Sequence, residues 1–140
     1  MAESLKFHYD VDGDNFTSAG AASVEVKRKL RQMGFPAETI RRVSIAMYEG
    51  EINMVVHARG GTADVFVEPG CITIILVDQG PGIPDIDLAM QEGYSTAPDN
   101  IRALGFGAGM GLPNMKRYTD EMQIETVLKK GTTVTMKVYV

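Results

Sequence analysis

Polar and hydrophobic positions in the first half of the chain predict one strand followed by two helices. Residues 6–11 alternate between polar and apolar side chains, which is typical of a half-buried strand. Apolar residues then recur at helical spacing from about residue 18, and Gly34 is placed to end that helix. A second helix is expected from Pro36, which suits a first helical position, to Ala58.

The second half of the chain predicts two hairpins with a third helix between them. A strand over residues 63–68 and an almost wholly apolar strand over residues 71–78 are joined by a Pro-Gly turn, which favours an antiparallel hairpin. Residues 86–104 show weak periodicity, so we expect a mobile loop there with at most one helical turn. A helix over about 109–118 and a closing hairpin over 122–140 complete the pattern.

This order of elements, β-α-α-β-β-α-β-β, predicts an α/β fold. We expect a two-layer sandwich with a mixed, mostly antiparallel sheet and three helices on one face. The length of 140 residues fits a single domain over residues 1–140. Hydrophobic residues make up 44% of the chain and charged residues 23%, a composition typical of a folded globular domain rather than a disordered segment.

Charge, cysteine and histidine content exclude several classes of function. The net charge of -4 provides no attraction to a nucleic-acid backbone. A single cysteine, Cys71, excludes an internal disulfide, and two histidines with one cysteine at unrelated spacings exclude a zinc site of the usual kind. The N-terminus lacks a signal-peptide pattern and no apolar run approaches the roughly 20 residues of a membrane helix, so a cytoplasmic protein is expected.

The first candidate binding motif is VDQGPGIPD, residues 77–85, in which an apolar strand ends on Asp78. A carboxylate at the end of a buried strand requires hydrogen-bond donors, because an unpaired buried charge is costly. Gly80 and Gly82 allow the backbone to approach a flat ligand or to adopt positive φ angles. Asp78 could equally accept the amides of its own turn, so a ligand-binding and a structural interpretation both stay open.

The second motif is LGFGAGMGLPNMKR, residues 104–117, in which four glycines lead into the predicted third helix. Successive backbone amides beside a helix N-terminus form an anion site suited to phosphates. The pattern is neither the dinucleotide-binding GxGxxG nor a P-loop, because a third glycine is missing at the required position and the chain contains no Gly-Lys pair. A flexible hinge is the alternative interpretation.

The third motif is YEGEINMVVHA, residues 48–58, in the second predicted helix. Glu49, Asn53 and His57 follow one another at intervals of four residues and therefore share one helix face. A carboxylate can deprotonate a nucleophile, and an amide oxygen is a hard ligand suited to magnesium that already holds phosphate oxygens. Alternatively, Glu49, Glu51 and Asn53 form a solvated polar stripe.

Together, the three motifs resemble those of the GHKL-type ATP-binding superfamily of DNA gyrase, heat-shock chaperones, histidine kinases and mismatch-repair ATPases. EGEIN resembles its helix-borne box, which implies that Glu49 is the general base and Asn53 the magnesium ligand. DQGPGI resembles its first glycine box, which implies that Asp78 receives the adenine amino group. GFGAGMGL resembles its second glycine box, which binds phosphates and hinges the lid over ATP.

The resemblance also implies a Bergerat-type ATP-binding fold and further nucleotide-binding residues. These are Gly80, Gly82, Ile83, Arg102, Gly105, Gly107, Gly109, Met110, Gly111, Leu112 and Thr133. Arg102 is the cation of the expected lid, residues 86–104, that could reach the γ-phosphate.

Within that superfamily, the chain is most similar to the small bacterial anti-sigma-factor serine/threonine kinases. The similarity covers nearly the whole chain and includes YSTA before the glycine motif and KKGTTVTMKV near the end. It implies a protein that binds ATP and Mg²⁺, binds a sigma factor or related regulator, and phosphorylates a serine or threonine of an antagonist protein. Two alternatives stay open: a binding module switched by ATP without protein phosphorylation, and a free-standing histidine-kinase catalytic domain. A homodimer also stays open.

Overall fold

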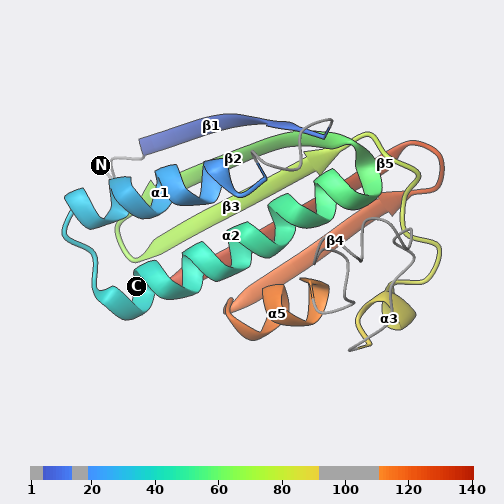
Figure 1. The fold of residues 1–140 in the computed structure, drawn as a ribbon. Coiled ribbons are helices and arrows are strands. Elements are labelled where there is room, and N and C mark those ends of the chain that lie inside the picture. Colours follow the sequence, from blue (N-terminus) through green and yellow to red (C-terminus); the bar gives the residue numbers. More distant parts are fainter. Residues whose placement is uncertain (1–4, 14–18, 92–110) are drawn as a thin grey trace.

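The computed structural model describes residues 5–13, 19–91 and 111–140, and it contains the expected elements in the expected order (Figure 1). The elements are β1 (Leu5–Asp12), α1 (Ala21–Gln32), α2 (Ala37–Ala58), β2 (Gly60–Glu68), β3 (Cys71–Asp78), α3 (Ile86–Ala89), α5 (Gly111–Arg117), β4 (Glu121–Val127) and β5 (Gly131–Tyr139). Helix α3 is the single helical turn expected in the loop after β3. The expected loop beyond residue 91 lies outside the described residues.

Five strands form one sheet in the order β1-β2-β3-β5-β4. Each described pair of neighbouring strands is antiparallel, so the parallel pairing implied by a mixed sheet does not occur among them. Short turns join β2 to β3 and β4 to β5, and such hairpin connections make those two pairs antiparallel. Between β1 and β2 the chain reverses direction three times, before α1, before α2 and before β2, so that β2 runs antiparallel to β1.

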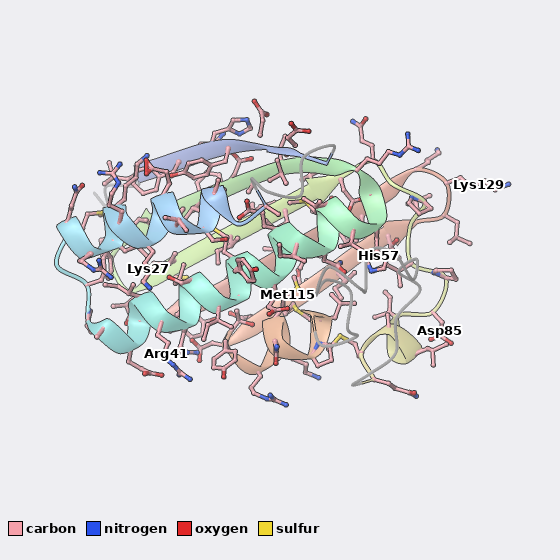
Figure 2. All side chains as sticks on the ribbon, viewed as in Figure 1. Lys27, Arg41, His57, Asp85, Met115 and Lys129 are labelled. Atoms are coloured by element: carbon pink, nitrogen blue, oxygen red, sulfur yellow. The ribbon has the colours of Figure 1, made fainter. Side chains whose placement is uncertain are left out.

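Helices α1, α2 and α5 cover one face of this sheet and form the second layer (Figures 1 and 2). Alternate strand residues point toward the helices, and Val65 and Ile74 are fully buried there. They share the hydrophobic core with Met47 of α2 and Met115 of α5, both also fully buried. Each such side chain contributes about 1.5–3 kcal/mol to folding through the hydrophobic effect. The predicted two-layer α/β sandwich is therefore confirmed.

A buried carboxylate joins α2 to the first turn of α1. Glu51 is 2% exposed. Its Oε2 accepts hydrogen bonds from the backbone N–H of Gly20 (2.8 Å) and Ala22 (3.2 Å). Its Oε1 accepts from the N–H of Ser23 (3.0 Å) and from the Ser23 hydroxyl (2.7 Å). Because α1 has no side-chain cap of its own, Glu51 pairs the donors that a helix N-terminus leaves open. The interpretation of α2 as carrying a solvated stripe is thus wrong for Glu51.

Candidate functional site

Glu49 and Asn53 lie one turn apart on α2, where this helix passes the first residue of α5. A Cβ atom built on Gly111 would lie 3.8 Å from Oε2 of Glu49 and 3.9 Å from Oδ1 of Asn53. A longer side chain at Gly111 would therefore reach both polar groups. The structure brings the helix motif together with the end of the second glycine motif, two segments separated by more than 50 residues in the sequence.

The environment of Glu49 suits a base. Glu49 is half-buried, and burial raises the pKa of its carboxyl above the ordinary value. A side-chain hydrogen bond from Asn114 of α5 acts in the opposite direction and lowers this pKa. A carboxylate shifted in this way, beside a position where phosphates could bind, is typical of general bases. The sequence analysis missed Asn114, whose only signal is that it follows Gly111 by three residues and so lies near the same face of α5.

Asp78 ends β3 and sits on the helix-covered side of the sheet, because it continues the alternation of the buried residues Ile74 and Leu76. Its Oδ1 accepts hydrogen bonds from the N–H of Gly80 (3.0 Å) and of Thr132 (3.2 Å). The structural interpretation is thus confirmed for one oxygen. Within residues 5–13, 19–91 and 111–140, Oδ2 has no hydrogen-bond donor, so this oxygen can accept from an amino group of a ligand.

The loop after Asp78 is held in place by contacts on both sides. A Cβ on Gly80 would lie 2.5 Å from Cβ of Ala58, so only glycine lets the loop pass the end of α2. Gly82 has a φ of +82° and lies against the β4–β5 turn. The N–H of Ile83 donates to the Thr126 hydroxyl at 2.8 Å. The first glycine motif is therefore a fixed platform beside Asp78.

The structure does not bring Thr133 to Asp78. In the β3–β5 register Asp78 pairs with Thr132, whereas Thr133 pairs with Val77. Successive residues of a strand point to opposite faces, so the side chain of Thr133 lies on the helix-free face of the sheet. Thr132 is buried on the helix side, and its hydroxyl lies 3.0 Å from that of Thr126. Of the two threonines, Thr132 is the one beside the candidate site, a difference of one residue in register.

His57 lies in the last turn of α2, on the same polar face as Glu49 and Asn53 and close to Asp78. Burial lowers the pKa of its imidazole, and the negative charge of Asp78 opposes this shift. The lowered pKa keeps His57 neutral at pH 7. The expectation that Glu49, Asn53 and His57 share a face is consistent with these contacts, because the three side chains meet Gly111 at one end and Asp78 at the other.

The remaining expected site residues fall into two groups. Leu112 is buried, and its side chain belongs to the hydrophobic core. The others lie outside the described residues: Arg102, Gly105, Gly107, Gly109 and Met110.

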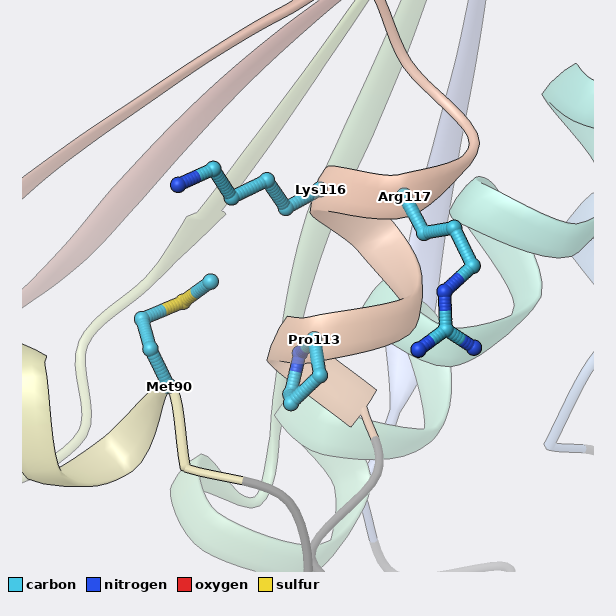
Figure 3. Close-up of a pocket in the computed structure, with 4 residues that line it drawn as sticks. All are labelled: Met90, Pro113, Lys116 and Arg117. Carbon is cyan, nitrogen blue, oxygen red and sulfur yellow. The ribbon is translucent and has the colours of Figure 1, made fainter.

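A cavity of about 490 Å³, open to solvent, lies between α3 and α5 (Figure 3). It is lined by Met90, Pro113, Lys116 and Arg117. Figure 3 shows Met90 facing Pro113 across the cavity, with the ammonium group of Lys116 above Met90. The sequence analysis did not single out these two cations, although basic residues in the last turn of a helix are a recognisable feature.

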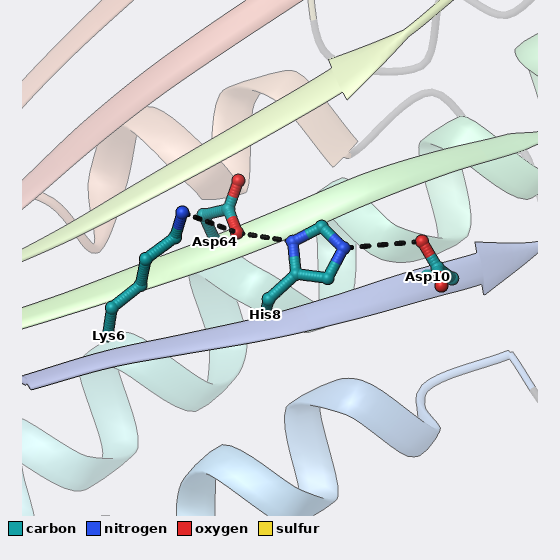
Figure 4. A network of polar contacts seen from close by, with 4 residues as sticks. All are labelled: Lys6, His8, Asp10 and Asp64. Atoms are coloured by element: carbon teal, nitrogen blue, oxygen red, sulfur yellow. Dashed lines mark hydrogen bonds and ion pairs between the residues drawn. The ribbon is translucent and has the colours of Figure 1, made fainter.

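A second cluster of titratable residues lies on the helix-free face of the sheet, at the β1–β2 edge (Figure 4). The His8 ring contacts Asp64 at 2.5 Å and Asp10 at 3.3 Å, and Lys6 lies 4.0 Å from Asp64. The hydrogen bond to Asp64 is the main cause of a raised His8 pKa. No helix in the described part of the chain is long and apolar enough to cross a membrane. Among the same residues, no three His, Cys, Asp or Glu side chains are placed so that they could hold a metal ion. This cluster is thus a polar surface network rather than a second site.

Comparison with known sequences identifies the family. Residues 15–138 match the model of the histidine kinase-like ATPase domain. The chain is 34% identical over 122 residues to the anti-sigma F factor of Clostridium novyi (strain NT), covering 83% of this chain and 82% of that protein. It is 33% identical over 110 residues to the serine/threonine-protein kinase RsbT of Bacillus subtilis (strain 168), covering 74% of this chain and 75% of that kinase.

Solved structures share the fold at lower sequence identity. The RsbU and RsbW domains of Rv1364c from Mycobacterium tuberculosis superpose with a TM-score of 0.66 at 17% identity, over 96% of this chain and about a third, 32%, of that longer chain. The mycobacterial sensor histidine kinase MprB superposes with a TM-score of 0.54 at 18% identity, over 96% of this chain and 97% of that one. On the family match and the relatives above 30% identity, the chain belongs to the histidine kinase-like ATPase domain family.

Proposed function

We propose that this protein binds ATP and Mg²⁺ between α2, the loop after β3 and the start of α5, and transfers the γ-phosphate to a serine or threonine of a partner protein. The observation that carries the proposal is the meeting of Glu49 and Asn53 at Gly111, on the side of α2 that leads to Asp78. Phosphoryl transfer depends mainly on positioning and on neutralising charge, and this arrangement supplies groups for both.

Each described residue has one proposed task. The open Oδ2 of Asp78 accepts from the adenine amino group, while the platform formed by Gly80 and Gly82 lets the flat base approach the end of β3. Asn53 offers an amide oxygen, a ligand type that magnesium accepts, and bound Mg²⁺ neutralises phosphate charge. Glu49 accepts the proton of the attacking hydroxyl.

The names of the relatives suggest the partners. Relatives named anti-sigma F factor and serine/threonine-protein kinase support a sigma factor or related regulator as one partner and a phosphorylatable antagonist protein as the other. We expect the protein to act in the cytoplasm, where ATP is available.

Two alternatives make different predictions for one experiment. An ATP-switched binding module retains ATP binding without labelling any protein. A free-standing histidine-kinase domain, favoured by the likeness of fold to MprB, labels histidine. Incubation with γ-labelled ATP and candidate partner proteins distinguishes them, because phosphoserine survives acid and phosphohistidine does not. A label that is lost in acid contradicts the proposal.

Variants on α2 separate binding from transfer. We expect Glu49→Gln to bind ATP with near wild-type affinity and to lose transfer by about a hundredfold or more. Asn53→Ala should instead weaken Mg²⁺-dependent ATP binding, measured by calorimetry with and without EDTA. Glu38→Gln is the matched control, because Glu38 is an exposed carboxylate in the first turn of the same helix. Equal losses of transfer in Glu38→Gln and Glu49→Gln would show that α2 contributes only general negative charge.

A further inference from the structure

We propose that the outer side of α1, together with Tyr48 of α2, is a docking surface for an acidic segment of a partner protein. Four exposed side chains make up this surface, which we call the α1 surface: Val24, Lys27, Arg31 and Tyr48. Docking at α1 goes beyond the proposed function, because α2 separates α1 from the candidate site at α5 (Figure 1), and it requires neither ATP nor phosphate transfer.

Helix α1 is strongly basic, although the chain as a whole has a net charge of -4. It contains four basic residues and a single acidic one, Glu25. Two of the cations have partners within the molecule: Arg28 donates to Glu25 at 2.7 Å, and the ammonium group of Lys29 lies over two aromatic rings of β1. Lys27 and Arg31 have no carboxylate partner within residues 5–13, 19–91 and 111–140. Their charge is therefore available to another molecule.

The members of the α1 surface form a row that is apolar at one end and cationic at the other (Figure 2). Val24, Lys27 and Arg31 follow one another at intervals of three and four residues, so their side chains lie along one side of α1. Tyr48 lies at the start of this row, because a Cβ built on Gly20, one turn before Val24, would lie 2.7 Å from Cε1 of its ring. Val24 is 66% exposed and Tyr48 is 42% exposed. The apolar end is therefore accessible to a partner.

The side of α1 opposite this row is fixed to the rest of the fold. Val26 and Leu30 are fully buried in the core. The Glu51 carboxylate holds the N–H groups at the start of the helix, as described above for the fold. Because the backbone of α1 is already ordered, a partner that docks on it does not have to compensate for the entropy of ordering a helix.

An acidic protein segment with an apolar side chain at one end fits both parts of the α1 surface. Carboxylates opposite Lys27 and Arg31 gain from charge complementarity, which raises the association rate and fixes the orientation of the partner. An apolar side chain against Val24 and the Tyr48 ring excludes water from the contact. Tyrosine and arginine are among the residues that contribute most to protein–protein binding, and the α1 surface contains one of each.

The composition of the α1 surface disfavours three other occupants. A membrane requires a broad apolar helix face, but the large apolar residues of α1 other than Val24 are buried in the core. A nucleic acid requires many phosphate contacts, and this surface offers only two cations. A second copy of the chain in a two-fold contact would bring Lys27 and Arg31 against the same two cations, which would repel each other.

The direct test uses a synthetic helical peptide and the full chain. The peptide has about five helical turns, with Leu on one face and Glu on both flanks, and a second peptide has Lys in place of each Glu. We expect the Glu peptide to bind with micromolar affinity that falls with added salt, and to shift the NMR signals of α1 and Tyr48 but not those of Glu49 and Asn53. The Lys peptide should not bind. Absence of these shifts with the Glu peptide overturns the proposal, as does equal binding of both peptides.

Charge reversal locates the contact on α1. Lys27→Glu combined with Arg31→Glu should weaken binding of the Glu peptide at least about tenfold, because attraction at two positions becomes repulsion. Val24→Ser should weaken it about threefold or more without any change of charge. The matched control is Lys130→Glu combined with Lys137→Glu, which changes two exposed lysines outside α1 and should alter the Kd less than about twofold. A similar loss in both double variants would mean that only net charge matters, and would overturn the proposal.

Two further measurements distinguish a protein partner from the other occupants. Vesicles of phosphatidylcholine and phosphatidylglycerol, and a DNA duplex, are titrated in place of the peptide; tighter binding of either to the α1 surface overturns the proposal. In cells that make this protein, a photo-cross-linking amino acid in place of Val24 should label a segment of another protein with more Asp and Glu than Lys and Arg. A cross-link to a second copy of this chain or to a basic segment, or no cross-link, overturns the proposal. None of these readouts involves ATP, so failure of the proposed function would leave them unchanged.

Discussion

Replacing Glu51 should destabilise the protein far more than replacing any exposed carboxylate. Four donors converge on its two oxygens at 2.7–3.2 Å: three backbone N–H groups and the Ser23 hydroxyl. In Glu51→Ala these buried donors lose their acceptor, and each buried unpaired donor costs about 1–3 kcal/mol. The simple sum, roughly 4–12 kcal/mol, is an upper bound because water can enter the space left by the side chain.

We therefore expect Glu51→Ala to lower the free energy of unfolding by about 3–5 kcal/mol, the usual range for breaking a buried charged network. Glu51→Gln keeps one acceptor oxygen but turns an NH₂ group toward the donors of α1, so about 2–3 kcal/mol is expected. For a chain of this length, a loss of 3–5 kcal/mol corresponds to a fall in Tm of roughly 10–15 °C.

Urea unfolding followed by circular dichroism measures these differences, with an unchanged m-value as the sign that two-state unfolding is preserved. Glu38→Gln is again the control, because its exposed ion pair with Arg41 is worth at most about 1 kcal/mol. A change below about 0.5 kcal/mol in Glu51→Gln would refute the reasoning, since it would mean that the N–H groups at the start of α1 are equally well paired without the carboxylate.

Two further predictions concern Asp78 and the histidines. Asp78→Asn should weaken ATP binding by about 1.5–3 kcal/mol, roughly 10- to 150-fold, and ATP should bind better than GTP, both measured by calorimetry. Equal ATP affinity in the variant would exclude Asp78 as the adenine acceptor. Burial lowers the pKa of His57, so the stabilisation that neutral His57 contributes should be lost as the pH falls below 6.5 toward the lowered pKa. In His57→Gln the free energy of unfolding should fall less steeply over this acidic range. The hydrogen bond to Asp64 raises the pKa of His8, so the stabilisation that protonated His8 contributes is fully present below pH 6.5 and is lost as the pH rises through the raised pKa. The variant His8→Gln should not show this loss of stability.

The elements of the fold were predictable because hydrophobic periodicity records which face of each element is buried. The prediction erred where a residue depends on a distant partner. Helix α1 begins at Ala21 rather than near residue 18, because Gly20 adopts a φ of +96° and the N–H groups after it turn toward Glu51. Nothing within the first 30 residues encodes that acceptor.

The candidate site was predictable as far as local motifs reach. The motifs predict one site that contains Glu49, Asn53 and Asp78; in the structure Gly111 lies near Glu49 and Asn53, and His57 of the same helix lies near Asp78. They could not distinguish Thr132 from Thr133, because that choice depends on how β5 pairs with β3. Asn114 was missed for a similar reason, since an asparagine in a helix acquires a role only when a second helix places Glu49 beside it.

The bond between Asp78 and the N–H of Thr132 spans 54 residues of sequence, so the proposed adenine acceptor is oriented by the last hairpin of the fold. During translation, at about 5–20 residues per second, Thr132 is added roughly 3–10 s after Asp78. Until β5 pairs with β3, the nascent chain contains all three motifs, but the Asp78 carboxylate has only one of its two backbone donors, the local N–H of Gly80. If Asp78 accepts from adenine as proposed, ATP binds best to a chain whose last hairpin has docked, and ATP then favours completion of the sheet by mass action.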